Sequence, residues 1–410
     1  MTPYVARITT VTATTFVTDA TAKSGTAPVD GPLVTSAKIG GAWAGMATTS
    51  DFPLDFLLGV CTNASSHLVR LNLKNDQTYT VSAAMVVVSG GINQLFGYSS
   101  SYGDGGRAVI DGGTSGAAYK LLDLGGINNG TLSDIEFKNN GATGGSTSTQ
   151  AVDLAGQSGW LIRRCVFRDF RAAGLNVAIS SSPIGHIVDE CEFYGCNQSN
   201  AVSVGALRVS GGSHVIRNTI FHDNTGSNTA GAITTSSGTA HFENCIFDSN
   251  GGVGATVSMI GSTFEGCEFY TNGSHGIAPT NSVVAKNCNF VNNVGAGVNN
   301  PTAIICTLIN CGFGAGTQAN DGGDVALTDF CNQIGSITYA ADVTPWVDPA
   351  NGDFRISLAG AKGAGRGVFL QTAASYAGTI GYPDVGAAQH LEVATPSGAA
   401  ELVNSDGLVG

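Results

Sequence analysis

The chain has 410 residues, of which 18 are Lys or Arg and 30 are Asp or Glu, so its formal net charge is −12 at pH 7. Binding to nucleic acid or to an anionic membrane needs clustered basic side chains, and the few here are scattered. With 58 glycines and only 12% charged residues, the composition favours short strands joined by tight turns. We therefore expect neither nucleic acid nor a membrane as a partner.

Residues 1–64 carry no repeat and are rich in Thr, Ala and Val. They have no basic start followed by an uninterrupted apolar run, so we expect neither a secretory signal nor a transmembrane segment there. We interpret residues 1–64 as an attachment or capping segment that docks onto another protein.

A two-residue signature then recurs eight times. In each copy a Cys, Ile or Thr is followed two residues later by Phe, which places both side chains on one face of a strand. The phenylalanines are 21 to 30 residues apart, a period typical of solenoids. The sequence predicts a core lined by the pairs Ile135/Phe137, Cys165/Phe167, Cys191/Phe193, Thr219/Phe221, Cys245/Phe247, Cys267/Phe269, Cys288/Phe290 and Cys311/Phe313.

Asparagines flank most of the signature strands. Asn tolerates left-handed backbone conformations, and equivalent amides on successive coils can stack into a ladder. The asparagines concerned are Asn218, Asn224, Asn244, Asn250, Asn272, Asn287, Asn293 and Asn310. The pattern predicts an all-β parallel β-helix. Leucine-rich repeats have a similar period, but their leucine-dominated strand motif is missing.

Six of the ten cysteines occupy the inward position of the signature. Buried thiols pack as small apolar groups. Neighbouring coils about 4.8 Å apart leave an occasional disulfide between coils open, and we favour free thiols. No closely spaced Cys/His quartet exists, so we expect no metal and no cofactor.

The repeated NCxF strands, the run GDGGRAVIDGG at residues 103–113 and two C-terminal pieces carry a family resemblance. The pieces are DPANGDFR at residues 348–355 and PDVGAAQ at residues 383–389. These motifs resemble right-handed parallel β-helix proteins of the pectate-lyase-like superfamily, over about residues 71–390. The two endings are similar to those that close β-helices in bacterial surface proteins and in virion proteins of tailed phages.

The resemblance implies a single-stranded right-handed β-helix over residues 65–340 and a closure over residues 341–392. We expect residues 393–410 to form a flexible tail. Because this scaffold carries lyases, hydrolases, adhesins and inert structural parts, the resemblance specifies the fold and leaves the activity open.

The residues on either side of each signature Phe are expected to face outward. The residues after Phe form a column of Lys138, Arg168, Tyr194, His222, Asp248, Tyr270 and Val291, and Glu136, Glu192 and Glu268 precede their Phe. Such a mixture of aromatic, acidic and basic groups suits sugars. We take Arg168, Glu192, Tyr194 and Tyr270 as candidate glycan contacts.

Asp248, Glu268 and His222 are the candidate catalytic residues. Asp248 and Glu268 fall on adjacent coils two residues out of register, which gives a Cα separation of roughly 8 Å. Inverting glycosidases hold their carboxyl groups about 6.5 to 9.5 Å apart. A solvated, inactive strand face would carry the same residue types. The calcium-binding aspartates of pectate lyases and the paired aspartates of polygalacturonases are missing, so we lean against an enzyme.

Val166, Ile220 and Ile246 also precede their Phe and are the outward residues least suited to water. We expect this stripe to contact another chain or a covering loop. Phage β-helix appendages are commonly trimeric, so the expectation is a homo-oligomer, and more specifically a trimer.

Three functions from different classes remain. The first, which we favour, is a structural virion protein of a tailed phage, serving as a capsid decoration, fibre or tail spike, docked through residues 1–64 and able to bind a host surface glycan. The second is a polysaccharide lyase or glycoside hydrolase of the tailspike type. The third is a bacterial adhesin, in which case the protein is extracellular or at the cell surface instead of on the virion.

Overall fold

The structure is a computed structural model of the 410-residue chain. It describes residues 8–12, 15–18, 39–40, 70–76, 78–80, 85–86, 93–101, 103–113, 120–124, 128–140, 150–170, 175–178, 185–196, 205–226, 231–257, 261–299, 306–314, 331–334, 337–339 and 344–357. Most of residues 1–64, residues 358–410 and the run 383–389 therefore lie outside the described residues. The attachment role of residues 1–64 and the tail at 393–410 stay predictions.

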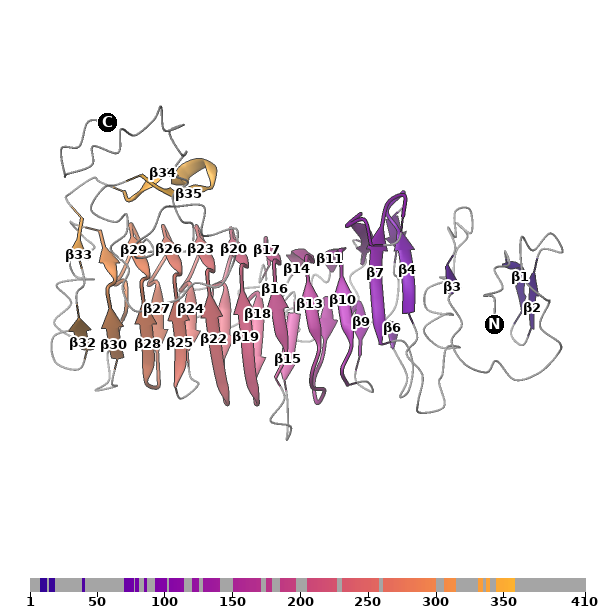
Figure 1. The fold of residues 1–410 in the computed structure, drawn as a ribbon, viewed down its shortest axis with the longest axis horizontal. Coiled ribbons are helices and arrows are strands. Elements are labelled where there is room, and N and C mark those ends of the chain that lie inside the picture. Colours follow the sequence, from indigo (N-terminus) through magenta and orange to yellow (C-terminus); the bar gives the residue numbers. More distant parts are fainter. Residues whose placement is uncertain are drawn as a thin grey trace, which may run out of the picture.

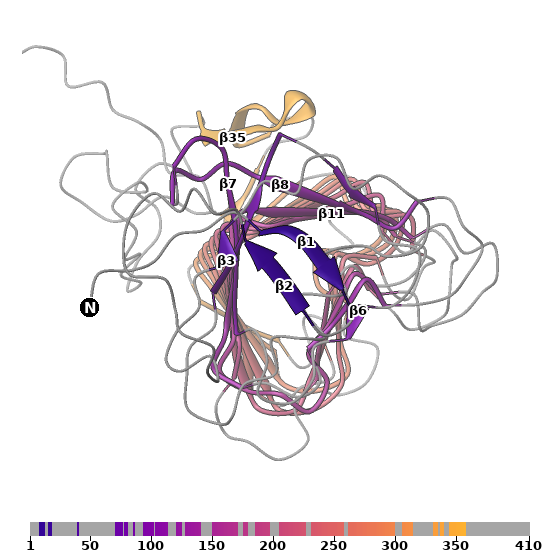
Figure 2. The same cartoon turned by 90° about the vertical axis from the view of Figure 1, so that its right-hand side faces the viewer.

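The described residues form short strands wound around one long axis (Figure 1). Three parallel sheets run along this axis, and the strands of successive coils superpose in the end-on view (Figure 2). From β4 to β27 each coil contributes one strand to each sheet in turn, so that neighbours in a sheet come from consecutive coils. The predicted all-β parallel β-helix is confirmed.

Sheet I has 12 strands: β3 (Ile39–Gly40), β4 (Arg70–Lys74), β7 (Gln94–Tyr98), β10 (Thr131–Ser133), β13 (Leu161–Arg163), β16 (Ile187–Asp189), β19 (Ser213–Arg217), β22 (Thr239–Glu243), β25 (Ser262–Glu265), β28 (Val283–Lys286), β30 (Cys306–Ile309) and β32 (Cys331–Ile334). Sheet II has 11 strands: β5 (Thr78–Thr80), β8 (Ala108–Asp111), β11 (Ile135–Asn140), β14 (Val166–Phe170), β17 (Glu192–Tyr194), β20 (Ile220–His222), β23 (Ile246–Asp248), β26 (Glu268–Tyr270), β29 (Asn289–Val291), β31 (Gly312–Phe313) and β33 (Ile337–Thr338). Sheet III has eight: β6 (Met85–Val86), β9 (Leu122–Asp123), β12 (Val152–Asp153), β15 (Leu175–Ala178), β18 (Leu207–Ser210), β21 (Ile233–Thr235), β24 (Ala255–Val257) and β27 (Ile277–Pro279).

Outside the helix, β1 (Ile8–Thr12) and β2 (Thr15–Thr18) form an antiparallel hairpin near the N-terminus. The described residues contain no helix long and apolar enough to span a bilayer. Their one helical element is the 3-10 turn η2 (Pro349–Asn351).

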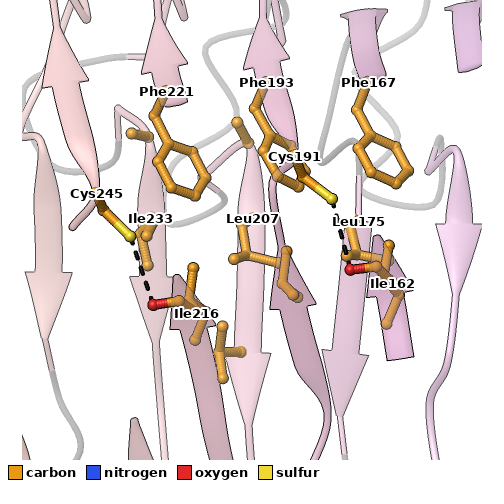
Figure 3. Packing of buried hydrophobic residues seen from close by; sticks show 14 of the residues in the cluster. Ile162, Phe167, Leu175, Cys191, Phe193, Leu207, Ile216, Phe221, Ile233 and Cys245 are labelled. Atoms are coloured by element: carbon orange, nitrogen blue, oxygen red, sulfur yellow. Dashed lines mark hydrogen bonds between the residues drawn. The ribbon is translucent and has the colours of Figure 1, made fainter. Parts of the chain in front are cut away.

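The signature phenylalanines form the continuous aromatic stack predicted for the core. All eight lie in sheet II, face inward and are at most 3% exposed. Rings on neighbouring coils are stacked, with centroids 4.6 to 5.3 Å apart from Phe137 to Phe313. Leucines and isoleucines of the other two sheets fill the space facing the rings (Figure 3). Parallel in-register strands place identical side chains one strand spacing apart, which lets every coil repeat the same packing.

A sharp corner between sheets I and II precedes each signature strand. The residue at this corner adopts a left-handed conformation in all eight copies, and Asn occupies four of them, with φ of 50° or 51°. Asp134, Arg164, Glu190 and Gly266 hold the other four corners, with φ between 51° and 59°. Asn and Gly accept this conformation at the lowest cost, so these corners explain one set of the recurrent asparagines.

The predicted amide ladder is present at the opposite end of sheet II. Asn224, Asn250, Asn272 and Asn293 are at most 1% exposed. The Nδ2 of each of the first three donates to the Oδ1 of the next, at 2.8 to 2.9 Å. Each Nδ2 also donates to the carbonyl oxygen of a signature Phe on the preceding coil, at 3.0 to 3.1 Å. A buried amide that is satisfied in this way fixes the alignment of neighbouring coils.

The C-terminal hairpin of β34 (Trp346–Asp348) and β35 (Asp353–Ile356) lies against the outer face of sheet II (Figure 1). Trp346 and Phe354 pack edge-on against Tyr270 of β26, with ring centroids 5.2 and 5.9 Å away. Val291 of β29 belongs to the same buried cluster. The part of the expected closure that is described therefore covers the flank of the helix at strands β23, β26 and β29.

Truncating the aromatic stack should destabilise the middle of the helix. Phe247 stacks on Phe221 and Phe269 at 5.1 and 4.6 Å, so Phe247→Ala leaves a cavity and should lower the free energy of unfolding by about 3–5 kcal/mol. Asp248→Ala, on the next residue but facing outward, should cost under about 0.5 kcal/mol. Denaturant unfolding followed by circular dichroism measures both. Equal costs would mean that the inward and outward assignments are wrong.

The two classes of asparagine should respond differently to glycine. Asn250→Gly removes four side-chain hydrogen bonds and leaves buried partners unpaired, which should cost about 2–4 kcal/mol. Asn244→Gly should cost under about 1 kcal/mol. It gives up the long 3.4 Å hydrogen bond from Asn244 Nδ2 to Asn218 Oδ1 but keeps the left-handed backbone, with φ of 50°, which Gly266 already adopts at the equivalent corner. The same unfolding assay measures both variants. A larger loss of stability for Asn244→Gly than for Asn250→Gly would contradict the ladder.

Candidate functional site

The uncovered part of the outer face of sheet II holds most of the candidate residues. Strands β11, β14, β17, β20 and β23 present two columns there, one residue before and one after the signature Phe. In Figure 1 this face runs along the row of strands from β11 to β23, and the C-terminal hairpin of β34 and β35 lies beyond its β23 end. Alternation along each strand sends the Phe inward and its two neighbours outward.

Charged residues of neighbouring coils pair with one another along and across these columns. Arg168 binds Glu136 on the preceding coil at 2.7 Å and its own neighbour Asp169 at 2.7 Å. Lys138 lies 3.3 Å from Asp111 on the coil before it. The pKa of Arg168 is raised: burial alone would lower it, and the hydrogen bonds to Asp169 and Glu136 outweigh that effect. The candidate glycan contact Arg168 is thus held by two carboxylates of its own chain.

His222 repeats the diagonal pairing of Arg168 two coils further on. Its Nε2 lies 3.1 Å from Glu192 on the preceding coil, and its Nδ1 lies 2.9 Å from Asp223. Its ring stacks on Tyr194, with centroids 5.0 Å apart. The hydrogen bond to Glu192 raises the pKa of His222, and the same bond lowers the pKa of Glu192. When it is protonated, His222 bridges two carboxylates, and in this state it has no lone pair with which to act as a base.

Asp248 follows His222 in the same column. Its Oδ1 accepts hydrogen bonds from the hydroxyls of Ser249 and Thr271, at 2.8 and 2.9 Å. Burial raises the pKa of Asp248, and these two hydrogen bonds oppose the shift. A half-buried carboxyl with a raised pKa is a chemically reasonable proton donor.

Glu268, expected from the sequence on an exposed acidic stripe, is buried in the structure. Its side chain is 0% exposed, although its strand position faces outward beside Ile246 and Asn289. Tyr339 covers this position and donates a hydrogen bond from its hydroxyl to Asn289. The negative charge of Glu268 contributes to a raised pKa of Tyr339, after the larger effect of burial. A carboxyl group under this cover cannot reach a polysaccharide on the surface, so Glu268 does not pair with Asp248 as an accessible catalytic dyad.

Tyr270 and Val291 face outward as expected, but the C-terminal hairpin covers them. The C-terminal hairpin packs on both, which leaves Val291 1% exposed. Tyr270, a candidate glycan contact, uses its ring against Trp346 and Phe354. The sequence offered a signal for this cover in the paired aromatics at 346 and 354, but no periodicity connects them to sheet II.

The apolar stripe has three different environments. Ile246 packs partly against the C-terminal hairpin, and Val166 is 2% exposed within the chain between Glu136 and Glu192. Ile220 is 39% exposed, the one member of the stripe that the described residues leave open to solvent. The predicted contact with another chain thus concerns Ile220.

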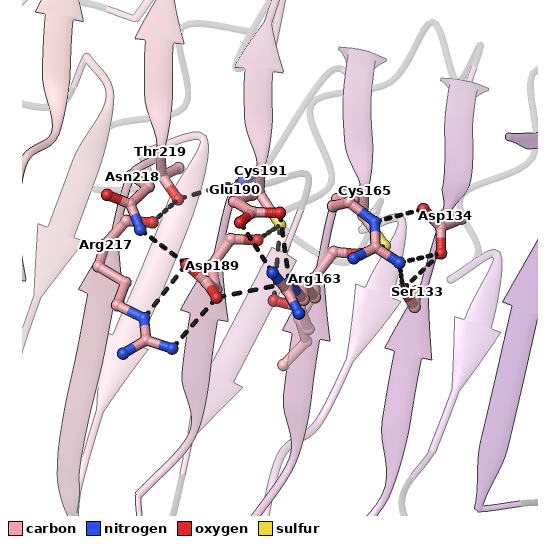
Figure 4. A network of polar contacts seen from close by, with 12 residues as sticks. Ser133, Asp134, Arg163, Cys165, Asp189, Glu190, Cys191, Arg217, Asn218 and Thr219 are labelled. Atoms are coloured by element: carbon pink, nitrogen blue, oxygen red, sulfur yellow. Dashed lines mark hydrogen bonds and ion pairs between the residues drawn. The ribbon is translucent and has the colours of Figure 1, made fainter. Parts of the chain in front are cut away.

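Sequence reasoning missed a second polar network, at the edge of sheet I (Figure 4). Asp189 is 4% exposed and receives hydrogen bonds from Arg217 and Asn218, at 3.2 and 3.0 Å. Asp134, 3% exposed, is held by Arg164 at 2.6 Å. Burial alone would raise the pKa of Asp134, but hydrogen bonds from Arg164 and Ser133 outweigh it and the pKa is lowered. These pairs join coils together and need no ligand. Among the described residues, no group of His, Cys, Asp and Glu side chains is arranged to hold a metal ion.

The pair of His222 and Glu192 should make stability depend on pH. Because the pKa of His222 is raised, its contribution is fully present below the unfolded value of 6.5 and is lost as pH rises through the folded pKa. Because the pKa of Glu192 is lowered from 4.5, its contribution is lost only as pH falls through the folded value. The free energy of unfolding of the parent minus that of His222→Gln should therefore be largest between about pH 4.5 and 6.5 and shrink towards about pH 8.5.

Urea unfolding at several pH values, with Tyr194→Phe as the uncharged control on the same face, tests this. The control should show no such pH-dependent difference from the parent. A His222→Gln difference that stays constant from about pH 5.5 to 8.5 would contradict the ion pair.

Comparisons with known proteins agree with the geometry. Residues 150–325 match the family described as "Right handed beta helix region". No curated protein sequence matches the chain. Among solved structures, ORF18 of Geobacillus virus E2 is similar over 70% of this chain and 56% of its own, with 13% identity and a TM-score of 0.48. The chain thus spans little more than half the length of that protein.

Two further solved structures are similar. The pectate lyase Pel9A is 14% identical over 79% of this chain and 88% of its own, with a TM-score of 0.46. PfbA, a surface adhesin of Streptococcus pneumoniae, is 13% identical over 71% of this chain and 70% of its own, with a TM-score of 0.35. At such identities the likeness concerns the fold alone. The stacked sheets and the match over residues 150–325 identify the fold as a right-handed parallel β-helix.

Proposed function

We propose that this protein is a structural component of a tailed-phage particle, a rigid β-helical rod displayed on the capsid or tail. The observation that carries the proposal is the unbroken aromatic stack from Phe137 to Phe313, which the amide ladder accompanies over four coils. A core repeated coil by coil, with buried amides that fix the alignment, resists bending and slippage. Such a core suits a part that bears load or holds another part at a distance.

The outer face of sheet II supports the same role. Its charged groups pair with one another, Arg168 with Glu136 and His222 with Glu192. Glu268 is covered by other parts of the chain. An active site for a polysaccharide would need accessible groups placed around a reacting bond. The polar groups here instead connect neighbouring coils, as expected of a surface built for stability in solution.

Two further parts of the proposal concern partners. Residues 1–64 would dock the rod onto other virion proteins, and Ile220, 39% exposed at the centre of sheet II, would contact another copy in a homo-oligomer. A trimer is the expected assembly. The virion is then the place where the protein acts.

Particle composition tests the proposal. Phage particles from cells that encode the chain should contain it at constant stoichiometry through successive density gradients, as measured by mass spectrometry. Sedimentation of the purified chain should give a defined oligomer that Ile220→Asp weakens, whereas Val284→Ala, on the outer face of sheet I, should leave it unchanged. A chain found only in the cell envelope or the medium would refute the virion role.

A second function is favoured by the stack of Tyr194 on His222, 5.0 Å apart and half-buried beside Asp248. Aromatic faces flanked by carboxylates suit a neutral or amine-bearing sugar, so the same face would bind a surface glycan or cleave it. Glycan-array binding with a parallel reducing-end release assay decides this. Binding that Tyr194→Ala abolishes and Val284→Ala preserves would establish a glycan site, and release abolished by Asp248→Ala would make the protein an enzyme. Absence of both binding and release would leave the structural rod alone.

A further inference from the structure

Six cysteines occupy the same buried slot on different coils. They follow the left-handed corner and open the signature strand: Cys165, Cys191, Cys245, Cys267, Cys288 and Cys311. Each is at most 2% exposed and has a free thiol. The last four are on consecutive coils, so their thiols form an uninterrupted row, which we call the thiol ladder together with Cys165 and Cys191.

Each ladder thiol acts as a hydrogen-bond donor. Cys191 Sγ donates to the carbonyl oxygen of Ile162 on the preceding coil, and Cys245 Sγ donates to that of Ile216, at 3.6 and 3.5 Å (Figure 3). The same thiols also lie 3.3 and 3.4 Å from the carbonyl oxygens of Asp189 and Glu243, two residues earlier in the chain. The other four repeat both contacts at 3.3 to 3.7 Å.

Thr219 indicates what this slot requires. It replaces Cys on one coil and is 0% exposed, and its Oγ1 donates to the carbonyl oxygen of Arg217 at 2.8 Å (Figure 4). Thr cannot form a disulfide, but it shares with Cys a small volume and a hydrogen to donate. Ile135 fills the same slot on another coil, also 0% exposed and unable to form a disulfide. The slot therefore needs a buried side chain and no disulfide, and the thiols serve the helix in their reduced form.

Oxidation before folding would oppose this arrangement. The coil spacing of about 4.8 Å lies within the Cα range that disulfides span, so a disulfide between two ladder cysteines can form, and it would remove both donated hydrogens. An unfolded chain with ten cysteines can also join coils that are not neighbours in the native helix. Once folded, the thiols are closed to solvent, and burial raises the pKa of Cys267, Cys288 and Cys311 well above the ordinary thiol range.

We infer that this chain must wind its helix in a reducing compartment, and that the folded helix then protects its thiols from later oxidation. A chain that folds in the cytosol of an infected cell and is later released into an oxidising medium meets both conditions. A chain that is exported unfolded through an oxidising compartment does not. This inference does not rest on the virion role, although it separates that role from secretion as an adhesin.

Refolding of the full chain tests it. The chain, unfolded in denaturant with reductant, is diluted into reduced or into oxidised glutathione. Native circular dichroism and cooperative unfolding should return with reduced glutathione. With oxidised glutathione each disulfide formed consumes two thiols and releases two molecules of reduced glutathione, and the native yield should fall several-fold. Mass spectrometry should then find ladder cysteines in disulfides, and added reductant should restore the yield.

Folded protein given the same oxidised glutathione is the matched control. Its ladder thiols should stay free and should react with N-ethylmaleimide only after denaturation. A second arm compares cytosolic expression with export to the bacterial periplasm, where native protein should appear only when the periplasmic thiol oxidase is deleted. Equal native yields under reducing and oxidising conditions, native disulfides within the ladder, or labelling of the folded helix would each overturn the inference. If the chain proved absent from virions, the expected refolding yields, disulfides and thiol labelling would be the same, so the two proposals fail independently.

Discussion

The in-register stacking of identical side chains on successive coils is the constraint on which the rest of the structure depends. Parallel strands about 4.8 Å apart repeat whatever they carry, so one favourable contact becomes a row of contacts. Phenylalanine rings, asparagine amides and thiols each form such a row. The Asn ladder fixes the alignment most strictly, because a shift of one residue would leave buried amides unpaired.

The sequence predicted this interior because the same constraint acts on the sequence. Phe247 and Phe269, or Asn250 and Asn272, recur at matching positions since each copy must fit the one before it. Coil length varies, as the 30-residue and 21-residue steps between phenylalanines show, and this variation is absorbed between the strands. Inward residues are therefore predictable from the repeat alone, including the buried residue that follows each corner, which is Cys in six of the eight copies.

The outer face was less predictable because its environment depends on a segment outside the repeat. Glu268 and Asp248 each stand beside a signature Phe and are acidic, so the sequence does not distinguish them. Glu268 is nevertheless covered, whereas Asp248 is half-exposed. The difference comes from Tyr339 and from Trp346 and Phe354 of the hairpin, which no periodicity aligns with β26. The diagonal pairs, such as Glu192 with His222, likewise appear only after coils of unequal length have been aligned.

The coils from Phe137 to Phe313 should behave as one continuous rigid unit, because their rings stack without interruption. Hydrogen exchange of the purified protein, followed by mass spectrometry, tests this claim most directly, since amide protection reports local opening. We expect strong and even protection of the sheet I and sheet II strands from β11 to β31, including those that carry His222 and Asp248. Rapid exchange confined to β17, β20 and β23 would contradict it, because it would mean that the stack is interrupted beneath the candidate site.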